Sequence, residues 1–317
     1  MKIEANFGFV TGCHAGDRHM VHATLASMRY YCPEVPICLV VDGDFDVSDL
    51  EKEYKLIILR ITDLPSKEMR SLIGNNYRAK LAAMWEGPFE RYVWLDSDAI
   101  IWGDFTSQVR SDLDFQIFWK EKENKQKKET TINNDVSSDF KHYYFNPDDL
   151  VQYDPNFRWR GNNYFCSGAF SCCKNVIRFE EWIIIESWLK NKPNMFGQLG
   201  EMGMLNYIVH AKAQRAEIKI DSIDLQHIWM HHGKEEIIND CAASGWEFPK
   251  LIERPRVLHF CGRKPWTLDR NAYSRPFTIA RLTHYRSHHS ELVAWMAVMY
   301  EDFLVLLRKI NRKLFRN

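Results

Sequence analysis

The stretch YVWLDSDAIIWGDF, residues 92–105, combines a buried-strand pattern with two acids at its end. Residues 92–95 form a short apolar run that is typical of a buried strand. Asp96 and Asp98 follow directly, and the sequence becomes apolar again at residues 99–102. Either these acids cap a turn at the surface, or they bind something positively charged at the end of a central strand.

The overall composition is that of a globular protein without a dominant charge. A chain of 317 residues can bury a substantial core as one large domain or two modest ones. Its 45% hydrophobic and 26% charged residues argue against a largely disordered chain. Basic and acidic residues number 42 each, so no global field attracts polyanions, and we expect no nucleic-acid partner.

The cysteine spacing and the N-terminal residues predict a cytoplasmic protein. The eight cysteines include no C-x-x-C pair, which favours reduced thiols over a disulfide framework or a structural zinc site. Residues 1–12 lack the charged start, long apolar core and cleavage site of a signal peptide. No uninterrupted apolar run approaches the ~20 residues that a membrane span needs. The inner face of a membrane remains an alternative location.

The first hundred residues alternate between strand and helix patterns, which predicts an α/β fold. Periodicity predicts strands at residues 7–13, 36–43, 55–61 and 91–95, and helices at residues 17–31, 46–53 and 76–87. This alternation indicates a Rossmann-like, mainly parallel sheet flanked by helices. Ligands collect at the carboxyl ends of the strands in such sheets, and Asp96 and Asp98 fall at one of those ends.

A polar and aromatic-rich stretch interrupts this pattern at residues 120–162. It opens with a run of mixed charges, residues 120–129, which predicts a solvated loop or insertion. A lid or acceptor-binding loop is the alternative, because aromatic rings stack on sugar faces. The rings that favour this alternative are Tyr143, Tyr144, Phe145, Tyr153, Phe157 and Trp159.

The remaining chain continues the α/β pattern and ends in a helix. Strands are predicted at residues 163–173 and 256–262, and helices at residues 175–191, 200–212 and 290–317. We divide the chain into one domain of residues 1–275 and a helical tail of residues 276–317. The last helix is apolar on several faces and ends in a basic cluster, so it is predicted to pack or dimerise, with peripheral membrane contact as the alternative.

The acid pair has the spacing of a metal site. In an extended chain, residues i and i+2 point the same way, so Asp96 and Asp98 can converge while Ser97 faces elsewhere. Two adjacent carboxylates raise each other's proton affinity unless a cation lies between them. Mg²⁺ or Mn²⁺ would remove that cost, especially if substrate phosphates complete the coordination shell.

A second motif, VLHFCGRKPW at residues 257–266, has the residues of a phosphate-binding element. A histidine on a strand is commonly structural, but here His259 is followed by Gly262, which lets a backbone approach a ligand closely. Lys264 provides a point charge suited to phosphate. An imidazole beside two carboxylates favours Mn²⁺ over Mg²⁺. Together the two motifs indicate that the protein handles a diphosphate.

The strand ending in LDSD, together with the later HFCGRKPW, resembles glycosyltransferase family 8, whose retaining enzymes include glycogenin and bacterial lipopolysaccharide galactosyl- and glucosyltransferases. The family pattern is H-x-x-G-x-x-K-P-W, and this chain is one residue shorter between glycine and lysine. The order of the pieces agrees from about residue 7 to about residue 266. The resemblance implies a GT-A fold, with the catalytic domain in residues 1–275 and a C-terminal helical extension.

The resemblance also implies roles for particular residues. Asp96, Asp98 and His259 match the metal ligands of the family. Glu201 matches the acid beside the donor sugar, and Lys264 would assist the leaving diphosphate. The donor-binding residues are Thr11, Gly12, Arg78, Lys80, Ser97, Ser167, Gly168, Gly262 and Lys264. Glu201 is either a covalent nucleophile or a hydrogen-bond partner of the sugar hydroxyls.

The implied activity is the manganese-dependent transfer of a hexose from a UDP-sugar to a saccharide or glycolipid acceptor, with retention of the anomeric configuration. Magnesium and a homo-oligomer are further expectations. Cys166 and Met202 depart from the family pattern, where an asparagine and a glutamine are usual. The alternatives are therefore an inverting GT-A transferase, or a nucleotide-sugar-binding protein that has lost catalysis.

Overall fold

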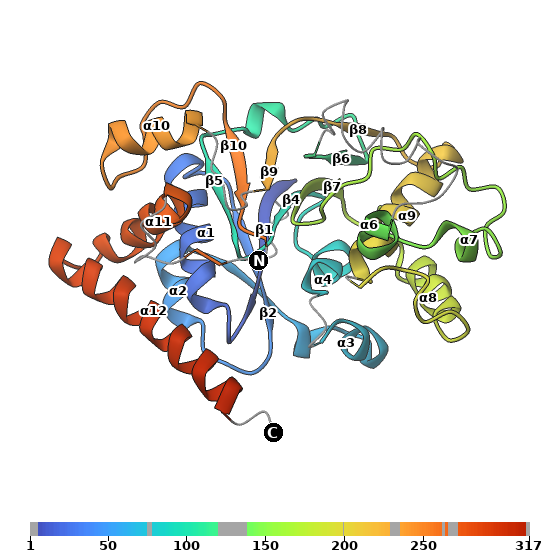
Figure 1. Ribbon diagram of the computed structural model, residues 1–317, viewed down its shortest axis with the longest axis horizontal. Coiled ribbons are helices and arrows are strands. Elements are labelled where there is room, and N and C mark those ends of the chain that lie inside the picture. Colours follow the sequence, from blue (N-terminus) through green and yellow to red (C-terminus); the bar gives the residue numbers. More distant parts are fainter. Residues whose placement is uncertain are drawn as a thin grey trace.

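The computed structural model describes residues 6–74, 78–119, 138–198, 200–228, 235–261, 264–265 and 272–314. A central sheet of seven strands divides this part of the protein, with helices on both sides (Figure 1). In spatial order the strands are β3 (Ile57–Arg60), β2 (Ile37–Asp42), β1 (Phe7–His14), β4 (Arg91–Leu95), β7 (Ala169–Cys173), β6 (Phe115–Ile117) and β8 (Ile220–Ser222). The α/β class predicted from the sequence is confirmed.

The sheet is parallel in its N-terminal half and mixed beyond β4. β1 pairs in parallel with β2 and β4, and β2 pairs in parallel with β3. β7 runs antiparallel to both β4 and β6, while β6 and β8 are parallel. The two faces of β4 explain its continuous apolar sequence: Tyr92 and Trp94 enter one hydrophobic cluster, and Val93 and Leu95 enter another.

A small second sheet places His259 next to the acid pair. It has the order β5 (Ala99–Trp102), β10 (Arg256–His259) and β9 (Gln226–Ile228). β5 follows the two aspartates directly and pairs antiparallel with β10, so that Ala99 lies opposite His259. The separation of 166 residues between Asp98 and Lys264 is closed by this pairing. The apolar run after the acids is therefore a strand in its own right.

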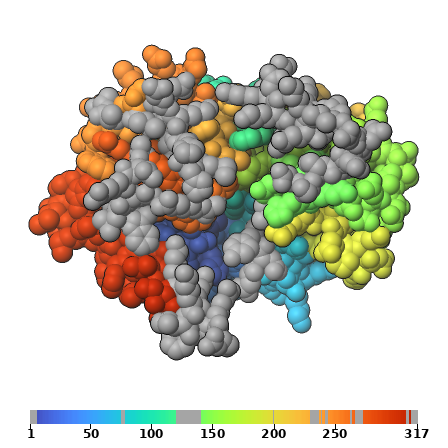
Figure 2. Space-filling view, in the orientation of Figure 1, coloured from blue at the N-terminus to red at the C-terminus, as the bar shows by residue number. Residues whose placement is uncertain are grey.

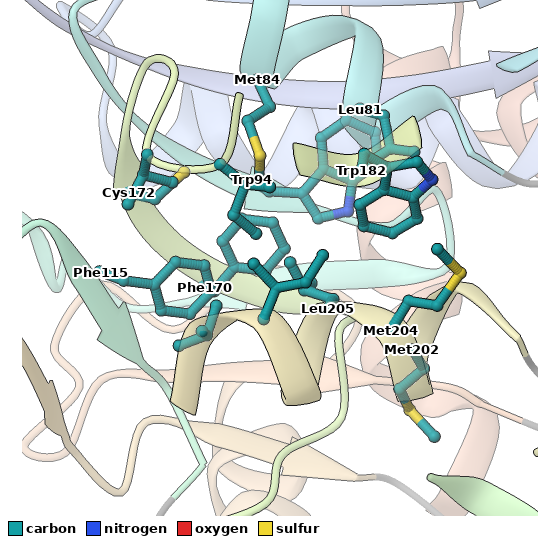
Figure 3. Packing of buried hydrophobic residues seen from close by; sticks show 14 of the residues in the cluster. Leu81, Met84, Trp94, Phe115, Phe170, Cys172, Trp182, Met202, Met204 and Leu205 are labelled. Atoms are coloured by element: carbon teal, nitrogen blue, oxygen red, sulfur yellow. The ribbon is translucent and has the colours of Figure 1, made fainter. Parts of the chain in front are cut away.

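Three helices of the N-terminal half lie close to their predicted positions, namely α1 (Arg18–Tyr31), α2 (Ser48–Tyr54) and α4 (Ala79–Glu86). A further helix, α3 (Lys67–Ile73), was not predicted. In the second half, α8 (Phe179–Trp188) and α9 (Glu201–Gln214) contribute to the larger core. Trp182 of α8 and Leu205 of α9 belong to the same cluster as Trp94 (Figure 3). This cluster covers the face of the sheet from which Lys80 and Glu201 enter the site.

The strand predicted at residues 163–173 is shorter than expected. Only Ala169–Cys173 forms β7, because the preceding residues bind a side chain instead of a strand. The buried amide of Asn206 accepts a hydrogen bond from Phe165 N at 2.9 Å and donates one to Phe165 O at 2.9 Å. Residues 165–168 consequently cross the end of β4, where Gly168 O accepts from Asp96 N.

The described part of the 120–162 stretch belongs to the core. It contains α6 (Ser138–Tyr143) and α7 (Pro147–Leu150). Tyr144, Phe145 and Phe157 are buried in the larger cluster, and Tyr153 stacks on Trp188 with ring centroids 5.1 Å apart. Tyr143 is exposed. The other rings therefore pack against the protein instead of belonging to a solvated loop, and a role of this stretch in acceptor binding stays a prediction.

Two C-terminal helices follow α10 (Glu235–Ser244). α11 (Arg275–Arg286) packs on α1, and its Phe277 and Ala280 share a hydrophobic cluster with Met20 and Ala23. α12 (Glu291–Leu314) lies outside α11, at the edge of the molecule (Figures 1 and 2). Among the helices described, none combines the length and apolar character needed to cross a membrane. The domain boundary at residue 275 stays a prediction.

Candidate metal centre

The turn that carries the two aspartates is fixed by four backbone contacts. Asp96 N donates to Gly168 O at 2.8 Å, and Ala99 N donates to Asp96 O at 2.9 Å. Phe260 N donates to Asp98 O at 2.9 Å, and the Thr24 hydroxyl donates to Ser97 O at 2.8 Å. The partners outside the turn are the residue before β7, the residue after β10 and a side chain of α1, so the turn is held from three directions.

Asp96, Asp98 and His259 form one group of three side chains. One ligand atom from each lies within 4.8 Å of the others. His259 Nε2 is 3.2 Å from Asp98 Oδ1 and 3.8 Å from Asp96 Oδ2. The convergence predicted from the sequence is confirmed. Two carboxylates and one imidazole are a donor set suited to a divalent cation, although the identity of an ion does not follow from it.

Positive charges compensate the buried acid Asp98. Burial alone would raise the pKa of Asp98, but His259 and the Lys264 ammonium, which binds Asp98 Oδ2, hold that pKa below its usual range. Burial opposes charge on His259 as well, but Asp98 raises the pKa of His259 well above its ordinary value. A bound cation could therefore take the place of Lys264 beside Asp98. An anionic ligand could then pair with Lys264.

Gly168 makes room for the imidazole. A β-carbon at this position would lie 2.2 Å from His259 Cε1 and 2.4 Å from Nδ1, far inside contact distance. Glycine is therefore required here for a reason of space. The sequence placed Gly168 among the donor-binding residues, and the structure places it directly beneath His259.

Two residues that the sequence analysis did not single out orient the ligands. Gln226, which is 2% exposed, has its side-chain nitrogen 3.0 Å from His259 Nδ1, and its oxygen has no hydrogen-bond partner. Trp94 donates from its indole nitrogen to Asp96 Oδ1 at 2.7 Å. Trp94 could have been found from its place at i−2 to Asp96. Gln226 carries no local signal, because it reaches the site only through the pairing of β9 with β10.

Lys80 is the second centre of positive charge. Its ammonium lies 3.1 Å from Ser167 Oγ, 3.3 Å from Glu201 Oε2 and 3.5 Å from Asp96 Oδ1. Burial would lower the pKa of Lys80, but Asp96 and Glu201 raise it, so the amine is charged. Lys80 thus connects the candidate metal centre to Ser167 and Glu201. The family resemblance implied a role for each of these three residues.

Glu201 begins α9 and has one oxygen available. Oε2 accepts a hydrogen bond from Lys80, whereas Oε1, although 3.2 Å from the ammonium, has no hydrogen bond of acceptable geometry. Burial raises the pKa of Glu201 above its usual value, against the lowering effect of Lys80. Oε1 thus has an ionic contact with Lys80 but no aligned hydrogen bond, so it can accept one from a ligand hydroxyl.

The other predicted residues lie in different surroundings. Thr11 is fully buried in β1, and its hydroxyl has no hydrogen-bond partner. A β-carbon at Gly12 would be 3.0 Å from Ala79 Cβ, so this glycine permits close packing of α4. Arg78 forms an ion pair with Glu186 at 2.6 Å. Gly262 lies outside the described residues.

The two departures from the family pattern have different consequences. Cys166 Sγ lies 3.5 Å from His259 Nδ1, so it contacts the imidazole on the same side as Gln226. Met202 is 6% exposed and belongs to the larger hydrophobic cluster (Figure 3). Met202 therefore adds packing at the start of α9 and brings no polar group to the site.

Comparison with known proteins identifies the fold. No protein-family model matches the sequence, and no curated protein matches it. The galactosyltransferase LgtC, solved with donor and acceptor sugar analogs, is 13% identical with a TM-score of 0.50, covering 86% of this chain and 95% of that chain.

The bifunctional glycosyltransferase WbbM is 11% identical with a TM-score of 0.51 and covers 94% of this chain. This chain spans 52% of the length of WbbM. The chain therefore has the fold of these glycosyltransferases, which confirms the GT-A architecture implied by its resemblance to glycosyltransferase family 8.

Proposed function

We propose that this protein is a metal-dependent retaining glycosyltransferase that transfers a hexose from a UDP-sugar to a hydroxyl of a saccharide or glycolipid acceptor. One observation carries the proposal. In a chain with a glycosyltransferase fold, Asp96, Asp98 and His259 converge at the end of β4, and two lysines lie beside them. This combination suits a nucleoside diphosphate, which needs a cation and further positive charge.

The proposed cofactor is Mn²⁺, with Mg²⁺ as the alternative. The ligands would be Asp96, Asp98 and His259, whose donor atoms lie close enough to share one ion. When bound, a divalent cation would neutralise charge that develops on the leaving diphosphate. An imidazole ligand favours Mn²⁺, because Mg²⁺ prefers an all-oxygen shell.

Lys264 is the residue proposed to bind the diphosphate. Its ammonium now neutralises Asp98, and its side chain is 40% exposed, so it can turn from that carboxylate to a phosphate oxygen. A lysine at the leaving group stabilises the negative charge that forms there as the glycosidic bond breaks. Gly262, two residues before it, would let the backbone approach the same phosphate.

Glu201 is proposed to bind hydroxyls of the donor sugar instead of attacking the anomeric carbon. The basis is its oxygen Oε1, which is buried and accepts no hydrogen bond. The Lys80 ammonium lies close to both oxygens of this carboxylate and to Ser167 Oγ. The acceptor hydroxyl would then attack from the face of the leaving group, which preserves the anomeric configuration. A covalent adduct on Glu201 would contradict this role.

The remaining proposed donor contacts are Thr11, Gly12, Ser97 and Arg78. Thr11 has a buried hydroxyl without a partner at the carboxyl-terminal half of β1. Gly12 follows Thr11 in the chain, and Ser97 lies between Asp96 and Asp98. Arg78 would have to leave its ion pair with Glu186 to reach a donor. We propose Thr11, Gly12 and Ser97 as nucleotide contacts, and Arg78 as one that depends on a rearrangement.

The test is a panel of UDP-sugars incubated with the full chain and Mn²⁺, with UDP release as the measurement. The expected result is slow hydrolysis of one or a few donors, abolished by a chelator. Addition of a saccharide acceptor should yield a product with the same anomeric configuration as the donor, read by proton NMR. The opposite anomer would indicate an inverting transferase. Donor binding without UDP release would indicate a nucleotide-sugar-binding protein.

A further inference from the structure

Helix α12 turns its polar residues toward the protein and a row of apolar residues outward. Glu301 and Asp302 are 9% and 4% exposed, and both bind the buried Arg281 of α11, at 2.9 and 2.8 Å. His22 of α1 contacts Glu301 at 3.1 Å. The inner face is therefore fixed by ion pairs, so the outer face is presented in a defined orientation.

The outward row has a regular spacing. It consists of Leu292, Met296, Met299, Phe303, Leu306 and Ile310, which are 39% to 71% exposed. Their intervals alternate between 4 and 3 residues, so the pattern repeats every seven residues, the heptad spacing that keeps one seam of a helix facing a partner helix. Monomeric proteins rarely expose so continuous an apolar surface. Packing against α11 does not use this row, since the buried apolar contacts of α12 are Ala294 and Val298.

We propose that α12 pairs with the α12 of a second copy of this chain, in an antiparallel, two-fold symmetric arrangement. In such a pair each seam residue meets a different residue of the other copy. Leu292 would pack on Ile310, Met296 on Leu306, and Met299 on Phe303. Each contact would occur twice, so that all six side chains of the row are covered in both copies.

The charge distribution favours the antiparallel direction. Glu291 begins the helix and already pairs with Arg286, whereas the sequence of the last two turns contains Arg308, Lys309, Arg312 and Lys313. Antiparallel pairing keeps the two basic ends at opposite ends of the pair. A parallel pair would place the two basic ends together, which is unfavourable.

The same distribution argues against a membrane surface as the occupant. A helix that lies on a membrane has basic residues along its polar face. Residues 291–307 contain no lysine or arginine, and their acids Glu301 and Asp302 are turned inward onto Arg281. Only the last turns of the helix are basic. A second protein helix therefore fits the apolar row better than anionic lipid does, and this inference does not depend on the proposed catalytic function.

The first test measures the mass of the full chain in solution by light scattering after gel filtration, at micromolar concentration. We expect twice the chain mass of 37.6 kDa. The double variant M299E/F303E should have half the mass of the wild type, with an unchanged circular dichroism spectrum. A matched control is Leu251→Glu, which places the same charge at a 91% exposed apolar residue elsewhere and should leave the dimer intact. A monomeric wild type would overturn the proposal, as would a dimer that survives the double variant.

The second test reads the direction of pairing. Variants Leu292→Cys and Ile310→Cys are mixed and oxidised, with the wild type as control for its native thiols. A disulfide-linked dimer should form between the two variants but not within either one alone. Efficient linkage of Leu292→Cys to itself would indicate a parallel pair and overturn the arrangement. A monomer that sediments with phosphatidylglycerol vesicles, and loses this with M299E/F303E, would instead assign the row to a membrane.

Discussion

The imidazole of His259 lies directly against the backbone of Gly168, so that a β-carbon on Gly168 would come within 2.2 Å of His259 Cε1. The same glycine accepts a hydrogen bond from Asp96 N through its carbonyl. One residue thus positions both an acid and the histidine of the candidate metal centre. A larger residue in place of Gly168 should therefore displace the histidine without removing any donor atom.

Gly168→Ala should weaken metal binding while leaving the protein folded. The added methyl group forces His259 away from Asp96 and Asp98. Changes around the ligands of other metal sites typically lower metal affinity by roughly 10–100-fold, and we expect a loss of that size here. Titration calorimetry with Mn²⁺ provides the measurement. Gly16→Ala is the matched control, since its β-carbon would meet His14 at an ordinary 3.4 Å. Equal Mn²⁺ affinity in the two variants would contradict the role of His259.

Lys80→Met should destabilise the protein, because it leaves the buried Glu201 and the partly buried Asp96 without their shared cation. Removing one partner of a buried ion pair costs about 3–5 kcal/mol. Urea unfolding measures the loss, in metal-free buffer. The double variant Lys80→Met with Glu201→Gln should recover part of that stability, since it also removes one unpaired charge. If the double variant were no more stable than Lys80→Met, the ion pair would not be the source of the loss.

Gln226 is expected to control which ring nitrogen of His259 carries the proton. An imidazole that binds a cation through Nε2 keeps its proton on Nδ1 and needs an acceptor there. The side-chain amide of Gln226 can rotate so that its oxygen, instead of its nitrogen, faces His259 Nδ1 and provides that acceptor. Gln226→Leu should lower Mn²⁺ affinity by about 10–100-fold, and Gln226→Glu should retain it. A similar loss in both variants would indicate that Gln226 acts through packing alone.

His210 is expected to make the fold sensitive to mild acid. Burial lowers the pKa of this side chain, which is 3% exposed, from 6.5 to about 4. Between these values the unfolded chain binds more protons than the folded one, so stability falls as the pH falls from 6.5 towards 4. The loss from this residue between pH 7 and pH 5 is on the order of 2 kcal/mol.

The variant His210→Gln tests this dependence, because glutamine can still donate to Asn163 O, which His210 Nε2 contacts at 3.1 Å. Urea unfolding at pH 7 and pH 5 should show a smaller drop in the variant than in the wild type. Comparing the two drops removes the contribution of other acid-sensitive groups such as His22, whose pKa is also lowered by burial. An identical drop in both proteins would show that His210 does not titrate in this range.

The fold and the three candidate ligands could be predicted from the sequence because local signals mark them. The alternation of strands and helices fixes the class, and Asp96 and Asp98 follow a strand that is apolar on both faces. His259 ends a second apolar strand. The pairing of β5 with β10, which brings these strand ends together, is a long-range contact that the sequence does not show.

The rest of the site depends on contacts that leave no local pattern. Gln226 acts through a three-residue strand, and Asn206 shortens β7 by binding the backbone of Phe165. The rings of residues 143–159 suggested a sugar-binding loop, but tertiary packing uses most of them in the core. Periodicity shows that a segment has an apolar face, but it does not show what that face meets. For α12, the sequence shows apolar residues on several faces. The structure identifies the exposed row, because it shows which face of the helix packs on the protein.

The central claim is that Asp98 and His259 hold a divalent cation that the reaction requires. Its most direct test is the rate of UDP release from the best UDP-sugar at saturating Mn²⁺, for the wild type, Asp98→Asn and His259→Ala, with the exposed Asp112→Asn as control. The account predicts a loss of roughly 10²–10³-fold for the two site variants, none for the control, and a native circular dichroism spectrum in all. Wild-type rates in both site variants would contradict it.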